Sequence, residues 1–164
     1  MMMAVEEEHV AESKVGVGDR APDFELTDDH LRRVRLADFR GTRNVLLVFY
    51  PLTFTSVCGG ELTALRDRLP EFEADEVTVL GVSSDSSAVH RTYVDREYLG
   101  FQLLSDFWPH GAAAKAYGVF DATTGLAQRA TFLINKTGVI SWTVDADMAT
   151  ARNTEDYLAA IAAL

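Results

Sequence analysis

The only cysteine of the chain, Cys58, lies in the segment YPLTFTSVCGGE, residues 50–61, among hydroxyl side chains and two glycines. A thiol becomes a nucleophile once it is ionised, and the first turn of a helix favours the thiolate because its unpaired N–H groups and the helix dipole are positive there. We expect a helix from about Thr55, directly after an apolar strand and Pro51, which would place Cys58 in that first turn. Thr55 would then share a helical face with Cys58, with its hydroxyl within reach of the sulfur.

The cysteine by itself is equally consistent with an inert buried thiol, which is common in protein cores. Gly59 and Gly60 each cost a helix about 1 kcal/mol relative to alanine, so their place in an early turn indicates close packing or ligand access beside the sulfur. Glu61 is either an exposed carboxylate of the first turns or the partner of a cation, and alone it would oppose a thiolate. A reactive thiol therefore requires a positive group nearby.

Composition restricts the class of protein. The 164 residues are 48% hydrophobic and 24% charged, which is typical of a globular chain with one core. We expect residues 1–14 to form a flexible arm and residues 15–164 a single domain. The net charge of −10, with no basic cluster other than residues 32–35, opposes nucleic acid binding. A lone cysteine, no signal-peptide pattern and no long apolar run predict a cytoplasmic protein without a membrane segment.

The order of apolar runs predicts an α/β fold. Residues 44–50 and 77–83 are expected to form buried strands joined by a helix, which implies parallel pairing, with the first of them the best candidate for the sheet centre. The other expected elements are an N-terminal hairpin over 16–26 and 32–39, helices over 55–74 (interrupted at Pro70), 87–98, 111–118 and 154–164, a strand over 101–106 and a hairpin over 130–144. A central mixed sheet flanked by helices follows, which is a thioredoxin-like fold.

The segment PLTFTSVC matches the Pro-x-x-x-Thr/Ser-x-x-Cys signature of the peroxiredoxins, with Pro51, Thr55 and Cys58 in register. The resemblance begins near Val15 and includes VLLVFYPLTFTSVCGGEL, LLSDFWPHGAAAKAYGVF and RATFLINKTGVI. The resemblance is greatest to the one-cysteine alkyl hydroperoxide reductase E group. Together, these segments are a far more specific sign of the family than an isolated cysteine.

The resemblance implies roles for five residues. Cys58 would be the peroxidatic nucleophile, Thr55 and Arg129 would donate hydrogen bonds to sulfur and peroxide, Pro51 would shield the pocket, and Glu61 would orient Arg129. From the sequence alone, Arg129 is a solvated charge before a strand, seventy residues from the cysteine.

The implied activity is thiol-dependent reduction of hydrogen peroxide and organic hydroperoxides, with peroxynitrite as a further candidate, through a sulfenic acid on Cys58. Thr63 occupies the position of a resolving cysteine found in some relatives, so the reductant must be external. The resemblance implies mycothiol with a mycoredoxin, and glutathione or a thioredoxin-like protein remain alternatives. No metal or organic cofactor is expected.

Other functions use the same residues. Cys58 could act as a redox sensor or relay that passes oxidation to a client protein, or the chain could be a non-catalytic thioredoxin-like binding module. A Cys58–His110 pair would instead suggest a cysteine hydrolase. The resemblance also implies a homodimer, and Phe107 and Trp108 in FWPHG are suited either to that interface or to the core.

Overall fold

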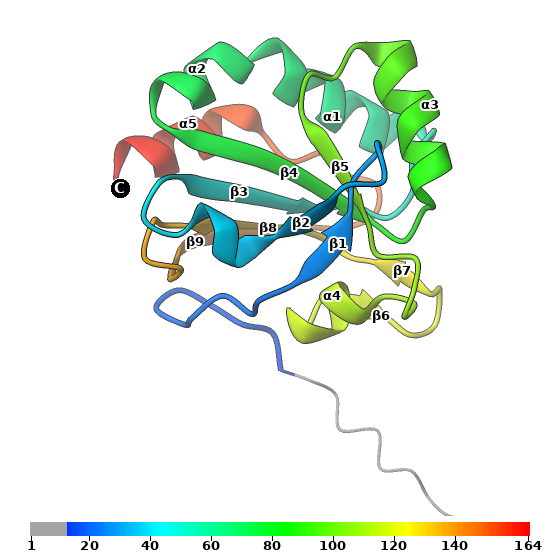
Figure 1. Ribbon diagram of the computed structural model, residues 1–164, viewed down its shortest axis with the longest axis horizontal. Coiled ribbons are helices and arrows are strands. Elements are labelled where there is room, and N and C mark those ends of the chain that lie inside the picture. Colours follow the sequence, from blue (N-terminus) through cyan, green and yellow to red (C-terminus); the bar gives the residue numbers. More distant parts are fainter. Residues whose placement is uncertain (1–12) are drawn as a thin grey trace, which may run out of the picture.

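The computed structural model describes residues 13–164, so the expected flexible arm, residues 1–14, lies outside the described residues except for its last two positions. The strands are β1 (Glu25–Thr27), β2 (Arg33–Arg35), β3 (Asn44–Phe49), β4 (Val77–Ser83), β5 (Gln102–Ser105), β6 (Phe120–Asp121), β7 (Leu126–Ala127), β8 (Arg129–Ile134) and β9 (Ile140–Ala146). The helices are η1 (Leu36–Phe39, a 3-10 helix), α1 (Ser56–Asp67), α2 (Leu69–Ala74), α3 (Ser87–Glu97), α4 (Ala112–Ala116) and α5 (Thr154–Ala162). They confirm the predicted α/β fold, with a mixed sheet flanked by helices and a hairpin near the N-terminus (Figure 1).

Seven strands form the main sheet in the order β2-β1-β5-β4-β3-β8-β9. β3 pairs in parallel with β4, and β4 with β5, as the helical crossovers predicted. β8 runs antiparallel to β3 and forms the expected hairpin with β9. The middle strand of the sheet is β4, not the expected β3, because four strands lie on one side of β3 and only two on the other.

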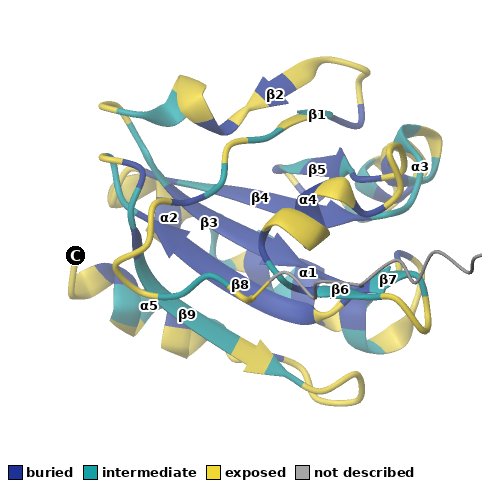
Figure 2. Ribbon diagram, turned by 90° about the horizontal axis from the view of Figure 1, so that it is seen from below, coloured by how far each residue is buried: buried dark blue, intermediate teal, exposed yellow. Residues whose placement is uncertain are grey.

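The sheet separates two apolar cores, and β3 supplies both. Val45, Leu47 and Phe49 pack into the core on the side of α4, and Leu46 and Val48 pack into the core on the side of α1, α2, α3 and α5. Successive side chains of a strand point to opposite faces, so a continuous apolar run is what a strand buried on both faces requires. Figure 2 shows β3, β4 and β8 as mainly buried strands.

The interruption predicted at Pro70 is confirmed, whereas other elements differ from expectation. Residues 55–74 form two helices, because Pro70 lies in the first turn of α2 and lacks the N–H that a continuous helix would use. The second strand of the first hairpin ends at Arg35, and Leu36–Phe39 form η1 instead. The short pair β6 and β7 was not predicted, since strands of two residues carry no periodic signal.

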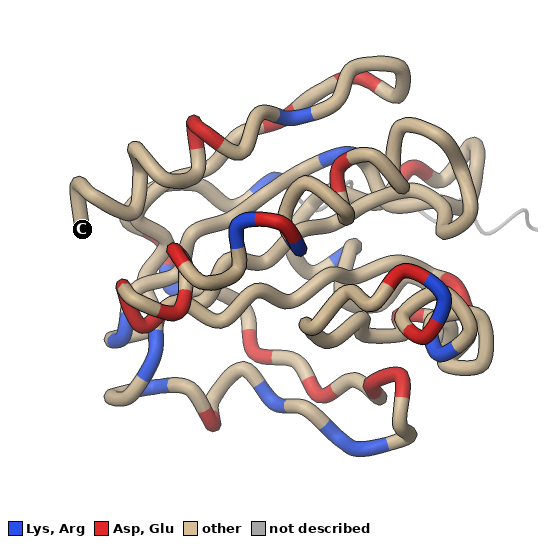
Figure 3. The backbone as a smooth tube through the Cα atoms, turned by 90° about the horizontal axis from the view of Figure 1, so that it is seen from above, with Lys and Arg blue, Asp and Glu red and all other residues tan. Residues whose placement is uncertain are grey.

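Charge is distributed over the molecule. Lys and Arg positions are scattered between Asp and Glu positions along the backbone (Figure 3). Within residues 13–164, no helix has both the length and the apolar character needed to cross a bilayer.

A buried polar network lies beneath the loop between β3 and α1. The carboxylate oxygen Oδ2 of Asp85 accepts hydrogen bonds from the Thr53 backbone N–H (2.9 Å), the Thr53 hydroxyl (2.7 Å) and the Ser83 hydroxyl (2.6 Å). The Nε2 atom of His90 lies 2.7 Å from Ser83 Oγ and 3.2 Å from the Tyr50 hydroxyl oxygen, which is 2.9 Å from Thr53 Oγ1. Two chains of hydrogen bonds therefore run from His90 to Asp85, one through Ser83 and the other through Tyr50 and Thr53.

Hydrogen-bond accounting assigns the tautomer of His90. Because the Ser83 hydroxyl donates to Asp85, its oxygen is left to accept, and His90 must carry its proton on Nε2. The other nitrogen, Nδ1, is buried without a hydrogen-bond partner among residues 13–164. Burial lowers the pKa of His90 to about 4, although the charges of Asp85 and Asp29 act in the opposite direction. The imidazole is neutral in the folded protein near neutral pH.

We predict that acid destabilises the protein in part through His90. Between pH 6.5 and pH 4 the unfolded chain protonates this imidazole and the folded protein does not, so the free energy of unfolding falls as pH falls through this window. The difference in pKa corresponds to about 3 kcal/mol. His90→Gln keeps a nitrogen donor near Nε2 but cannot be protonated. Urea unfolding from about pH 7 to about pH 4 should show wild type losing about 3 kcal/mol more than this variant, and equal losses would contradict the prediction.

Candidate active site

The N-terminus of α1 presents free backbone donors. The helix begins at Ser56, and Thr55 is its N-cap in an extended conformation (φ −109°, ψ 155°) whose side chain makes no capping hydrogen bond. The amides of residues 56–58 precede the first intrahelical bond, which Gly59 N–H donates to Thr55 C=O at 2.8 Å. Unpaired amides and the positive end of the helix dipole therefore surround Cys58, which confirms its predicted place in the first turn.

Cys58 lies on the buried face of α1 with Leu62 and Leu65 and is only 1% exposed. Close packing on this face explains one of the two glycines. A Cβ atom on Gly59 would lie 3.0 Å from the hydroxyl oxygen of Tyr93, whereas one on Gly60 would meet no atom within 4 Å. The absence of a side chain at Gly59 thus leaves room for the Tyr93 hydroxyl beside the helical turn that holds Cys58.

Sheet pairing brings Arg129 to the cysteine. Ala130 of β8 pairs with Phe49, the last residue of β3, so Arg129 lies beside the end of β3 from which the chain runs into α1. Its Nη1 atom donates to Cys58 Sγ at 3.4 Å. The arginine is 2% exposed, so it is not the solvated charge that its sequence position alone suggested.

Glu61 holds two guanidinium groups. Its Oε1 atom accepts from Arg129 Nη1 and, at 3.0 Å, from Arg152 Nη2. Its Oε2 atom accepts from Arg152 Nε and from the Arg152 backbone N–H, both at 2.7 Å. These four bonds fill the acceptor capacity of a carboxylate. Glu61 is buried and is the partner of cations rather than an exposed carboxylate.

The charges of Arg129, Arg152 and Glu61 do not cancel unless the Cys58 sulfur is also charged. Burial alone would raise the pKa of Glu61, but hydrogen bonds and charge from Arg152, with the charge of Arg129, hold that pKa below its ordinary value. Burial likewise opposes the charge of Arg129, yet contact with Cys58 and Glu61 raises its pKa. Two guanidinium groups and one carboxylate leave one net positive charge, which a thiolate at Cys58 would neutralise.

Known proteins resemble this chain in sequence and in overall fold. The model of the AhpC/TSA family matches residues 17–143. The chain belongs to the AhpC/TSA family. It is 44% identical over 150 residues to alkyl hydroperoxide reductase E of Mycobacterium tuberculosis, a match that covers 92% of this chain and 98% of that protein.

Solved peroxiredoxin structures have the same fold. Reduced Plasmodium vivax 2-Cys peroxiredoxin superposes with a TM-score of 0.82 at 31% identity, covering 90% of this chain and 80% of that one. Enterococcus faecalis AhpC superposes with a TM-score of 0.82 at 30% identity, covering 90% of both chains. The peroxiredoxin resemblance and the thioredoxin-like fold expected from the sequence are confirmed.

One expected contact of the peroxiredoxin motif differs. The Thr55 hydroxyl donates to Leu52 C=O at 2.6 Å and makes no hydrogen bond to Cys58. The expectation of a shared helical face required Thr55 to be helical, but it is the extended N-cap and its side chain leaves in another direction. Pro51 is buried and lies in the same loop, two residues after the end of β3.

Arg152 was missed by sequence reasoning. It lies in the segment VDADMATARN, residues 144–153, directly before the N-cap of α5, where an isolated arginine carries no motif and suggests solvent exposure. In the structure its side chain is buried, and Nη1 donates to Phe49 C=O (2.7 Å) and Thr131 Oγ1 (3.1 Å). Only tertiary contacts identify this residue as a member of the buried ion cluster.

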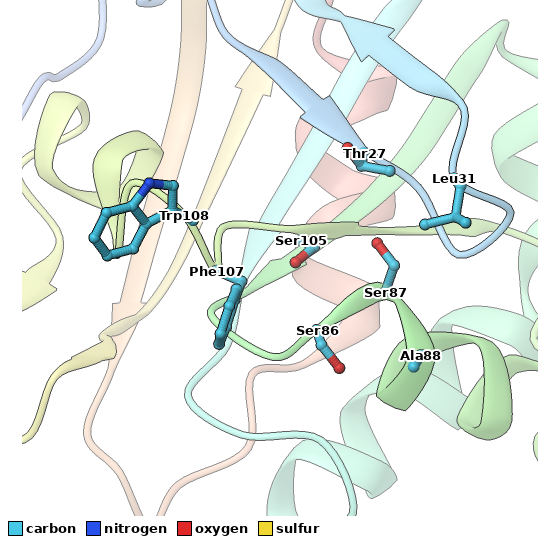
Figure 4. Close-up of a pocket in the computed structure, with 8 residues that line it drawn as sticks. All are labelled: Thr27, Leu31, Ser86, Ser87, Ala88, Ser105, Phe107 and Trp108. Carbon is cyan, nitrogen blue, oxygen red and sulfur yellow. The ribbon is translucent and has the colours of Figure 1, made fainter.

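A surface groove of about 390 Å³ lies at the ends of β1, β5 and α3, and none of the five predicted site residues lines it. Its lining residues are Thr27, Leu31, Ser86, Ser87, Ala88, Ser105, Phe107 and Trp108 (Figure 4). Phe107 and Trp108 are 56% and 81% exposed, so the core alternative for them is wrong. His110 contacts Gly125 C=O at 2.7 Å and packs against Phe120, and no contact supports a cysteine–histidine hydrolase pair.

We predict that Glu61→Gln destabilises the fold. The substitution keeps the shape but leaves Arg129 and Arg152 buried without a counter-ion, and the free energy of unfolding should fall by about 3 kcal/mol. Urea denaturation measures the change. Glu71→Gln is the matched control, because its partner Arg68 stays solvated at the surface and little change is expected. Equal stability of Glu61→Gln and wild type would show that the buried charge cluster contributes little to the free energy of unfolding.

Proposed function

We propose that the protein is a thiol-dependent peroxidase that reduces hydrogen peroxide and organic hydroperoxides at Cys58. The observation that carries the proposal is the 3.4 Å contact between Arg129 Nη1 and Cys58 Sγ within a buried cluster that has one uncompensated positive charge. Membership of the AhpC/TSA family and the likeness to alkyl hydroperoxide reductase E support the same activity.

In the first step the Cys58 thiolate attacks the nearer oxygen of the peroxide. An S–O bond forms as the O–O bond breaks, and the far oxygen leaves with the electron pair and takes up a proton as water or an alcohol. The sulfur is oxidised to a sulfenic acid and the peroxide is reduced. Charge moves onto the leaving oxygen, so donors placed there contribute most of the acceleration.

Arg129 has one N–H available for that purpose. Its Nε donates to Asp147 C=O (3.2 Å), one Nη2 hydrogen goes to Met148 C=O (2.9 Å), and the two Nη1 hydrogens go to Glu61 and Cys58. A guanidinium carries five N–H donors, which leaves the second Nη2 hydrogen for a peroxide oxygen. Thr55 can add a second donor by releasing Leu52 C=O, and Pro51 closes the loop side of the pocket. Because Cys58 is buried, neighbouring side chains must move aside for the peroxide to enter.

The sulfenic acid is reduced by external thiols. A first thiol displaces water and forms a mixed disulfide with Cys58, and a second thiol releases the cysteine as the reductant becomes a disulfide. Mycothiol with a mycoredoxin is the reductant we favour, with glutathione or a thioredoxin-like protein as the alternatives, and a reducing cytoplasm would supply any of them. In the relay alternative, a client protein would take the place of the first thiol.

We predict rapid oxidation of the reduced protein by hydrogen peroxide. Stopped-flow fluorescence should give a rate constant well above that of free cysteine, and Arg129→Ala should lower it by at least about tenfold because a donor to the leaving oxygen is lost. Arg91→Ala removes an exposed arginine paired with Asp95 on α3 and should react like wild type.

A wild-type rate no greater than that of free cysteine would reject the peroxidase. A persistent mixed disulfide with one protein, without turnover by small thiols, would favour the relay.

We also propose a homodimer formed through the groove beside the site. Leu31, Phe107 and Trp108 present large exposed apolar side chains along it. The groove adjoins the active-site loop through Asp85, whose carbonyl accepts from Ser105 Oγ at 2.6 Å. A second copy of the chain would therefore cover this face close to the cysteine.

The dimer is tested by sedimentation velocity. We predict that Trp108→Ala weakens association by at least about tenfold, because aromatic anchors at the centre of an interface carry much of its energy. Tyr98→Ala is the matched control, since this tyrosine is 85% exposed at the opposite end of α3 from the groove. A monomeric wild type, or equal effects of the two substitutions, would contradict the proposal.

A further inference from the structure

The loop that joins β3 to α1, residues 50–55, is held to the rest of the protein at Thr53. Thr53 is buried and uses both its backbone N–H and its hydroxyl to bind one oxygen of Asp85, at 2.9 and 2.7 Å. Asp85 belongs to the segment between β4 and α3, so the bond links two chain segments 32 residues apart. Tyr50, at the start of the loop, contacts the same Thr53 hydroxyl at 2.9 Å.

The bonds between Thr53 and Asp85 help to hold a strained backbone conformation at the next residue. The next residue, Phe54, has a φ of 66°, a left-handed conformation that is unfavourable for a bulky side chain and persists only where surrounding contacts determine it. The Phe54 ring packs edge-on against Tyr93, with ring centroids 5.0 Å apart. The loop therefore holds an uncommon conformation through Thr53 on one side and Phe54 on the other.

The network resembles a hydrolase triad only in composition. Ser83 and His90 are fully buried, and Asp85 accepts from Ser83 rather than from His90 Nδ1, which has no partner in the described part of the chain. A substrate could not reach this serine, and the aspartate does not orient the imidazole as a triad requires. Its bonds instead run toward the loop, and His90 supports Ser83 from behind.

We propose that Thr53 and Asp85 are positioning residues for peroxide reduction. They act through the loop that carries Pro51 and Thr55 and leads into the turn of Cys58, and they touch neither the sulfur nor the peroxide. The inference rests on the proposed peroxidase function. Chemistry at the O–O bond depends on the geometry of all donors around it, and a shift of about 1 Å can cost a hundredfold in rate. Loss of the Thr53 hydroxyl removes one of the two bonds between Thr53 and Asp85 and loosens the loop, while the cysteine and its arginine remain.

Thr53→Val tests the inference because it removes the hydroxyl and keeps the shape. Its rate of oxidation by hydrogen peroxide should fall by about tenfold. Its rate of alkylation by iodoacetamide should change by less than about twofold, because that reaction requires only an accessible thiolate and no donors to a leaving peroxide oxygen. Thr53→Ser restores the hydroxyl and should recover the wild-type peroxide rate. Thr92→Val, which removes an exposed hydroxyl bonded to Ala88 C=O within α3, should leave both rates unchanged.

The same two rates separate the possible failures. A wild type that reacts fast with peroxide, together with an unchanged rate in Thr53→Val, would overturn the positioning role and leave the peroxidase intact. Peroxide and alkylation rates that change in parallel would also overturn it, since they would indicate general loosening of the fold. Asp85→Asn offers a second variant, because it replaces the shared carboxylate acceptor with a neutral amide, and it should also slow peroxide oxidation selectively. A wild type no faster than free cysteine would overturn the proposed function and this inference with it.

Discussion

The buried carboxylate of Glu61 is the interaction on which the site depends. It accepts four hydrogen bonds from Arg129 and Arg152, and without it two guanidinium groups would stand in the core with no counter-charge. With it, one positive charge remains beside the sulfur of Cys58. The same ion cluster therefore keeps Arg129 cationic, directs it at the cysteine and joins α1 to the start of β8 and to the segment that follows β9.

The sheet determines where these groups meet. Parallel pairing of β3 with β4 directs their C-terminal ends to the same edge, and antiparallel β8 begins at that edge with Arg129. The helix α1 starts there as well, with free amides in its first turn. A nucleophile, a cation and helix N-terminal donors are thus collected at one end of the sheet.

The loop between β3 and α1 shows how local conformation changes an expectation. Thr55 precedes the helix rather than belonging to it, so its hydroxyl turns to Leu52 C=O and not to the sulfur. The loop is instead attached to the protein through Thr53 and Asp85. Spacing along a chain predicts a shared face only where both residues lie in the same regular element.

The sequence by itself determined the main elements, because apolar periodicity, Pro70 and the turn at residues 135–138 act locally. It also determined the first-turn place of Cys58, and the peroxiredoxin motif pointed to Arg129 and Glu61. Only the tertiary structure decided that Arg129 is buried at the sulfur, that Arg152 completes the ion cluster and that Asp85 holds the loop. These contacts join segments that sheet pairing brings together across 32 to 91 residues, and no local pattern in either partner specifies them.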